Sequence, residues 1–389
     1  MGTLTYQPNF DIHMPVFNES KTRARTDKKR SIQQSLYSFY NNSALQEHEK
    51  IRAEINYLFD FYDADIPEKN KVLKDLRSFN DIGFYSVYFE LVIYCLLKKN
   101  GFEVKIHPKL NNGSEKKPDF LVTHIETKEE FYLELVTCFE HDDSHLNRLK
   151  QGVENLKEAF PNFIFEYDIK GRLKDSRQTD VKIKEIKCWL NSIKLEDISK
   201  NNKYIWKIEE FEFELKLTLR TETESLSINS NVIFDHYPQK KIIDSLNTKK
   251  DKYGELDKPF IIATTLRPSE FSFNPLLNPM ISALCGYLNI LKTPHQYEKG
   301  FWVYNQNKKI HLKNEHICAV WYFDELIPER ISDVNYDLFL LPKNPIMCPS
   351  SLYNTFSGTC FINLNIEKIT TETYYKKVNI YENIFEKNL

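Results

Sequence analysis

A nearly unbroken apolar stretch, GFYSVYFELVIYCLL at residues 83–97, limits what this chain can fold into. It follows Asp81, a residue type that caps helix N-termini, and it stops shortly before Gly101, which suits the left-handed position just past a helix. The spacing predicts a helix from Asp81 to about Asn100. Because this helix is apolar almost all round, we expect other elements to cover it, and it should lie at the centre of its domain.

Three strands are predicted directly after this helix, at residues 102–110, 118–125 and 131–137. The polar segment 126–130 between the second and third strands is short enough for a hairpin. The local order is therefore helix, strand, strand, strand, which indicates an α/β fold.

The remaining segments divide the chain further. Residues 163–235 alternate short β-like runs with a helix-like piece, and we interpret them as a large, partly β insertion. After it, 240–253 has helical spacing, and PFIIATT at 259–265 is typical of a strand buried on both faces. The predicted parts are an N-terminal arm and helical extension at 1–80, a core with its insertion at 81–325, and a loop-rich C-terminal extension at 326–389.

The composition narrows the class of protein. Among 389 residues, 41% are hydrophobic and 14% aromatic, which is enough for a sizeable core and argues against global disorder. Ten glycines are too few for a glycine-rich nucleotide fold or a β-solenoid. The formal net charge of −2 excludes a globally basic nucleic-acid binder but leaves room for a local basic groove. Residues 21–30, KTRARTDKKR, are either a phosphate-contacting arm or, in the favoured interpretation, a solvated charge run.

Cysteine usage and hydropathy bear on the compartment. The seven cysteines include no CxxC pair, so we expect reduced structural thiols in a cytoplasmic protein. The first residues lack the apolar core of a signal peptide, and no apolar stretch approaches ~18 residues, the length that spans a bilayer. We therefore expect neither secretion nor membrane insertion.

Three acidic residues stand inside the apolar runs: Glu90 on the predicted helix, Asp119 after Pro118 on the second strand, and Glu134 in FYLELVT on the third. A turn centred near residues 127–128 would place Asp119 opposite Val136 and diagonal to Glu134, at roughly 7–8 Å on one face. Buried carboxylates are costly unless they are paired or bound to metal. Oxygen ligands suit Mg²⁺ or Mn²⁺, although each acid alone is also compatible with an ordinary salt bridge. His107 is considered as a further ligand, but scattered histidines are usually structural.

The order of these elements resembles the pattern of the PD-(D/E)XK nuclease superfamily, whose fold is restriction-endonuclease-like. The resemblance rests on a helix with Glu90, a Pro118-Asp119 step on one strand, and Glu134-Leu135-Val136 on the next strand. The resemblance implies an α-β-β-β-α-β core and a metal-dependent endonuclease that hydrolyses phosphodiester bonds. It implies that Glu90, Asp119 and Glu134 share one Mg²⁺ or Mn²⁺. DNA is favoured over RNA as the substrate, and a role in intracellular defence is compatible with the superfamily.

One position departs from the superfamily pattern, because Val136 stands where the motif has a lysine. In some members that lysine comes from the following core helix, and this chain offers Lys249 as the first choice and Lys252 as the second. Without a working lysine, the alternative is a catalytically inactive module that binds nucleic acid or a partner protein. A plain structural protein with salt-bridged acids is a third interpretation. Whether the chain forms a homodimer or has a partner subunit is left open.

Overall fold

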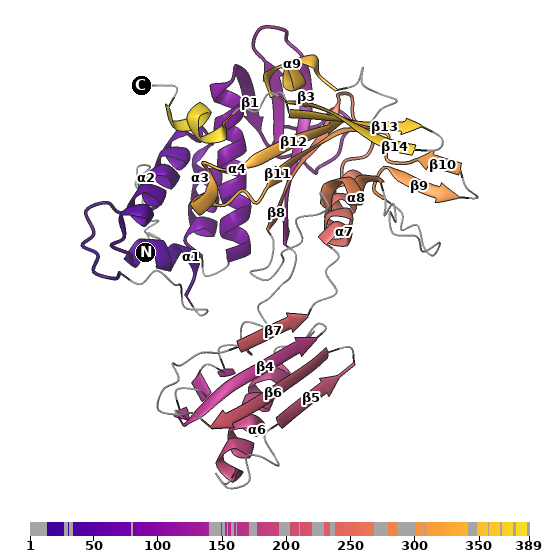
Figure 1. Ribbon diagram of the computed structural model, residues 1–389. Coiled ribbons are helices and arrows are strands. Elements are labelled where there is room, and N and C mark those ends of the chain that lie inside the picture. Colours follow the sequence, from indigo (N-terminus) through magenta and orange to yellow (C-terminus); the bar gives the residue numbers. More distant parts are fainter. Residues whose placement is uncertain are drawn as a thin grey trace, which may run out of the picture.

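One eight-stranded mixed sheet organises the main body of the protein (Figure 1). Neighbouring strands run parallel at three of the pairings and antiparallel at the others, so the fold class is mixed α/β, as predicted. Across the sheet, the strands are β1 (Phe102–Ile106), β2 (Phe120–His124), β3 (Glu130–Phe139), β8 (Phe260–Arg267), β11 (Ile317–Asp324), β12 (Asn335–Leu340), β13 (Gly358–Asn365) and β14 (Lys368–Tyr375).

The computed structural model describes most of the chain. Among the described residues, no helix is both long enough and apolar enough to cross a membrane. The described residues are 14–26, 30, 34–78, 81–139, 149, 152–153, 155–156, 159–160, 162–170, 177–193, 203–209, 211–219, 229–233, 238–267, 279–285, 300–306, 309–340, 348–356, 358–365, 368–375 and 379–386.

Helices lie on both sides of the main sheet (Figure 1). On one side lie the N-terminal helices together with a short C-terminal helix. Their apolar side chains form a single cluster with that face of the sheet. On the other side, two helices share a second cluster with the opposite face. The first group contains α1 (Leu36–Asn42), α2 (Gln46–Phe61), α3 (Ile66–Leu76), α4 (Asp81–Lys99) and η4 (Glu382–Glu386), and the second contains α7 (Pro238–Lys250) and α8 (Pro279–Cys285).

Helix α4 lies between the sheet and the other N-terminal helices, as its apolar sequence predicts. It ends at Lys99, and Gly101 follows with a φ of 85°, the left-handed conformation expected just past a helix. Asp81 is the first helical residue rather than the cap before it. Its carboxylate accepts a hydrogen bond from the Leu36 N–H (2.9 Å), which fixes the start of α1 against α4.

The β2–β3 hairpin has a different register from the predicted one. Phe120 lies opposite Leu133, so the ladder is shifted by two residues from a pairing of Asp119 with Val136, and that prediction is wrong. The reason is the turn. The His124 N–H bonds the Glu129 carbonyl (2.9 Å) and Lys128 takes a φ of 60°, so the turn centres between residues 126 and 127, one residue nearer to the end of β2 than the sequence suggested.

The alternation of side chains along β3 decides which acid faces which helix. Leu133 and Leu135 belong to the apolar cluster with α4, whereas Tyr132 and Cys138 belong to the cluster with α7. By the period of two, Glu134 points to the α7 side of the sheet. Glu90 comes from α4 on the other side of the sheet. The carboxylates of Glu90 and Glu134 therefore approach the start of β2 from opposite faces.

The predicted insertion contains a second sheet of four strands and one described helix, drawn apart from the main sheet in Figure 1. Strand β6 pairs with β4 and β5, and β7 lies parallel to β4 at the edge. Its apolar side chains form their own cluster. The elements are β4 (Phe163–Lys170), α6 (Arg177–Ser192), β5 (Lys203–Ile208), β6 (Phe211–Leu219) and β7 (Asn229–Ile233).

The prediction of a loop-rich extension after residue 326 is wrong for much of that segment, because β12, β13 and β14 continue the main sheet. Pro328, which begins a 3-10 turn, and Pro349, which directly precedes a short helix, stand between strands of this sheet. The remaining elements are β9 (Val303–Gln306), β10 (Lys309–Leu312), η2 (Pro328–Arg330) and α9 (Ser350–Thr355).

Candidate functional site

A cavity of about 320 Å³ lies where α3, α4 and α7 meet the ends of β2 and β3. Three of the four predicted site residues, Glu90, Asp119 and Lys249, line it. Its other lining residues are Glu68, Lys71, Val72, Asp75, Gly83, Ser86, Val87, Phe89, Leu135, Val136 and Thr137.

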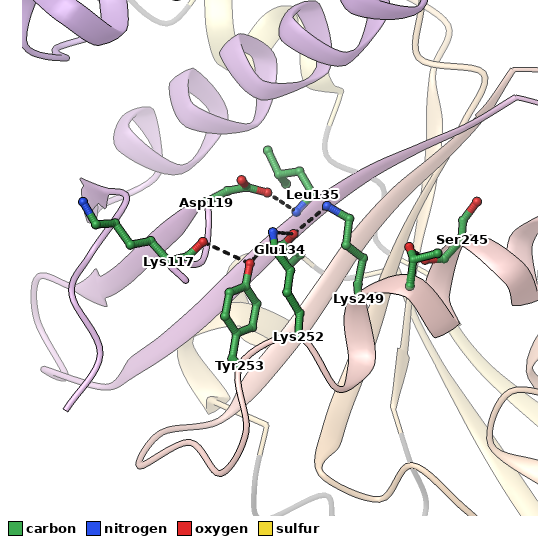
Figure 2. A network of polar contacts seen from close by, with 9 residues as sticks. Lys117, Asp119, Glu134, Leu135, Ser245, Lys249, Lys252 and Tyr253 are labelled. Atoms are coloured by element: carbon green, nitrogen blue, oxygen red, sulfur yellow. Dashed lines mark hydrogen bonds and ion pairs between the residues drawn. The ribbon is translucent and has the colours of Figure 1, made fainter. Parts of the chain in front are cut away.

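Glu134, the fourth predicted residue, is fully buried on the α7 side of the sheet and holds a network of polar contacts (Figure 2). Its Oε1 lies 2.6 Å from Lys249 Nζ and 2.9 Å from Lys252 Nζ. Its Oε2 accepts a hydrogen bond from the Tyr253 hydroxyl, which also lies 3.1 Å from the carbonyl oxygen of Lys117. Burial and then the Glu134 charge raise the pKa of Tyr253, so this phenol stays protonated and keeps donating.

Lys249 reaches Glu134 because of its place in the last turn of α7. Lys252 and Tyr253 follow in the turn just after the helix, and both side chains also reach Glu134. Lys250, between them, points elsewhere, and its Nζ lies 3.1 Å from Asn314 Oδ1. The structure thus places Lys249 in the same cavity as Asp119, the position predicted for a lysine that replaces the one missing at Val136.

Asp119 stands just before the first paired residue of β2, beside the point where β3 carries Glu134. Its Oδ2 accepts a hydrogen bond from the Leu135 N–H (2.7 Å), which ties the two strands together beyond their ladder. Burial raises the pKa of Asp119, and the neighbouring Glu134 charge raises it further. The negative charge on Asp119 is therefore costly in this environment, and a cation beside it would lower that cost.

Glu90 projects from the middle of α4 into the cavity. The Tyr62 hydroxyl donates to its Oε1 (2.5 Å) and orients the carboxylate. Burial raises the pKa of Glu90 to about 7, with the Asp119 charge acting in the same direction. Near neutral pH this carboxyl group changes its charge, which is typical of residues at functional sites.

The predicted three-carboxylate set is brought together only in part. Among the described residues, the group of metal-ligating side chains whose donor atoms all lie within 4.8 Å of one another is Glu68, Glu90 and His107. Asp119 lines the same cavity as Glu68 and Glu90, whereas Glu134 contacts the lysines. His107 was named from the sequence as a possible further ligand, but a structural role was favoured for it. Glu68, in the N-terminal extension, was missed because no local pattern links α3 to β2 and β3.

Tyr253 and Tyr62 were also missed. Tyr253 had a signal, since it lies four residues after Lys249, one helical turn away on the same face. Tyr62 follows α2 and carries no such signal, because its contact with Glu90 joins elements that are separate in the sequence.

The basic run at 21–30 contributes nothing to this cavity in its described part. The Arg23 guanidinium bonds the backbone carbonyls of Asn18 (2.6 Å) and Lys21 (2.8 Å). Arg30 pairs with Asp81 at the start of α4. These contacts tie Arg23 and Arg30 to neighbouring parts of the protein, while Lys21 is exposed. A contact of this run with phosphate stays a prediction.

The site therefore combines two carboxylates of raised pKa, those of Glu90 and Asp119, with the ammonium group of Lys249, which is held 2.6 Å from the buried carboxylate of Glu134. This chemistry suits the binding of a divalent cation and of a negatively charged group beside it. Compared with known proteins, the chain matches no family model, no curated protein and no solved structure.

Proposed function

We propose that this protein is a metal-dependent nuclease of restriction-endonuclease-like fold that hydrolyses phosphodiester bonds, with DNA favoured over RNA. The order α4-β1-β2-β3-α7-β8, with β3 parallel to β8, supports the proposal, because it has the α-β-β-β-α-β arrangement that the resemblance implies. The second sheet is inserted between β3 and α7, as a subgroup-specific addition would be.

The single observation that carries the proposal is the position of Lys249. The motif lysine is missing at Val136, and Lys249 lines the same cavity as Asp119 and Glu90 while its Nζ lies 2.6 Å from Glu134. An ammonium at this place can orient a water and offset the charge of a scissile phosphate. If Lys249 were only an ordinary lysine at a solvated helix end, its ammonium group would be in water and would not contact Glu134.

The carboxylates fit a divalent cation. Asp119 and Glu90 would hold it, since both line the cavity and both have raised pKa values that a nearby positive charge would reverse. Once bound, Mg²⁺ or Mn²⁺ would acidify water and stabilise negative charge on the phosphate. Both oxygens of Glu134 contact Lys249, Lys252 or Tyr253. We therefore assign Glu134 to the positioning of Lys249 rather than to metal binding.

We expect Asp119→Asn to lower the rate of plasmid cleavage in Mn²⁺ by about 100-fold, because it removes the charged ligand while keeping the hydrogen bond from Leu135. The measurement is the cleavage rate of supercoiled plasmid. Asp251→Asn is the matched control, since Asp251 is exposed and is not among the residues lining the cavity.

Cleavage that survives in Asp119→Asn at the wild-type rate would place the active site elsewhere. A second candidate is an inactive module that binds nucleic acid, and it is favoured by the saturation of Glu134 with positive partners. Wild-type protein that binds DNA but leaves both single-stranded and double-stranded DNA intact would establish that alternative.

A further inference from the structure

We infer that Glu68, Glu90 and His107 form a binding site for a divalent transition-metal ion. One ligand atom from each of the three side chains lies within 4.8 Å of the others, a separation that one ion can bridge. The three residues come from α3, α4 and the segment just after β1. The inference goes beyond the proposed nuclease activity and does not depend on it, because it concerns binding alone. Glu90 is common to this site and to the proposed active site, whereas Glu68 and His107 belong to this site only.

The site is built by contacts that orient its ligands. The backbone N–H of His107 donates to the Asp119 carbonyl (2.9 Å), which fixes the imidazole beside the end of β2. His107 Nε2 lies 3.3 Å from Glu68 Oε1. The Tyr62 hydroxyl donates to Glu90 Oε1, the kind of supporting hydrogen bond that orients metal-ligating carboxylates. Each ligand is thus held by an element other than its own.

The charges around the cavity leave a position for a cation. Glu68, Glu90 and Asp119 line it together, while the lining lysines are Lys71 and Lys249. Lys249 is paired with Glu134, which is not among the residues lining the cavity. Lys71 Nζ lies 2.8 Å from Glu68 Oε1, but its side chain is 58% exposed, so it can move into solvent and release that oxygen.

The donor set selects the kind of ion. One imidazole nitrogen with two carboxylates suits Mn²⁺, Zn²⁺ and similar ions, whereas Mg²⁺ prefers oxygen donors and keeps its waters. The competing ammonium of Lys71 makes a second, opposite prediction. Removing a ligand weakens binding of the ion, and removing Lys71 strengthens it.

The experiment uses the full chain, stripped with EDTA and titrated with Mn²⁺, with the free ion followed by electron paramagnetic resonance. His107→Asn should weaken binding by at least about 10-fold, the loss seen when a ligand or its support is removed. Asparagine is chosen because it tolerates the φ of 45° at this position. Lys71→Met should tighten binding by up to about fivefold, the size of an exposed ion pair's contribution. Lys74→Met, on the exposed face of the same helix, is its control and should change nothing.

Pulsed resonance of bound Mn²⁺ should show coupling to an imidazole nitrogen in the wild type and none in His107→Asn. Circular dichroism checks that the variant is folded, and Glu68→Gln provides a second test of the same site if it is not. Asp119→Asn separates this site from the proposed active site, because it should lose cleavage and keep the nitrogen coupling. If Mn²⁺ affinity falls in Asp119→Asn and is unchanged in His107→Asn and Glu68→Gln, the inferred site is wrong.

Discussion

Replacing Lys249 and Lys252 together by methionine is expected to lower the free energy of unfolding by about 3–5 kcal/mol near pH 7.5. Glu134 has no exposed surface, and the two ammonium groups lie 2.6 and 2.9 Å from its Oε1. Without them the carboxylate keeps only the Tyr253 hydroxyl and the cost of its burial is no longer offset. Methionine is unbranched and only one atom shorter than lysine, so the change tests mainly charge rather than packing. Denaturant unfolding measures the effect.

Two comparisons make this result specific. Lys250→Met, on the same turn, should cost less than about 1 kcal/mol, because Lys250 pairs with Asn314 and with the exposed Asp251. Adding Glu134→Leu to the double variant should recover most of the lost stability, since apolar side chains of similar size can replace a buried ion pair at little cost. If the double lysine variant is as stable as Lys250→Met, Glu134 does not depend on these lysines.

Glu90→Gln is expected to raise the free energy of unfolding by about 2–3 kcal/mol at pH 8 in EDTA, and by less than about 1 kcal/mol at pH 5. Burial raises the pKa of Glu90 to about 7, above the value near 4.5 of an unperturbed glutamate. The folded state therefore binds the proton more tightly than the unfolded state, and wild-type stability falls as the pH rises from about 4.5 to about 7. A neutral glutamine keeps the acceptor for Tyr62 and carries no charge at either pH.

Chemical denaturation of the wild type and the variant at several pH values tests this prediction. Glu103→Gln, at an exposed position on β1, is the control and should show no comparable pH dependence. Adding Mn²⁺ should reduce the advantage of Glu90→Gln, because a bound cation stabilises the charged carboxylate. A variant that is less stable than the wild type at pH 8 without metal would show that ionised Glu90 already has a compensating partner.

Much of the core is predictable because its signals are local. The apolar run of α4, the continuous apolar strand β8 and the helical spacing of α7 each identify an element without reference to any other. The two glycines after the helical patterns, Gly101 and Gly254, both adopt positive φ, at 85° and 71°. Periodicity and capping act over a few residues, so the sequence is enough to find them.

The candidate site is predictable where it depends on those same elements. Asp119 and Lys249 meet in one cavity because each stands at the end of a correctly predicted element. The register of the hairpin was wrong by two residues, since the bonds within its turn decide it and the strands pair equally well by hydrophobic pattern in either register.

The sequence by itself determined that an apolar helix and a hairpin would bring lone acids toward a lysine from a later helix. Only the tertiary structure decided which charges pair. Glu134 binds Lys249 and Lys252, and Glu90 faces Glu68 and His107. The physical reason is that these partners come from elements far apart in the chain, whose distances depend on how helices pack on a sheet. That packing decides which carboxylates already have a positively charged partner and which would gain from a bound cation.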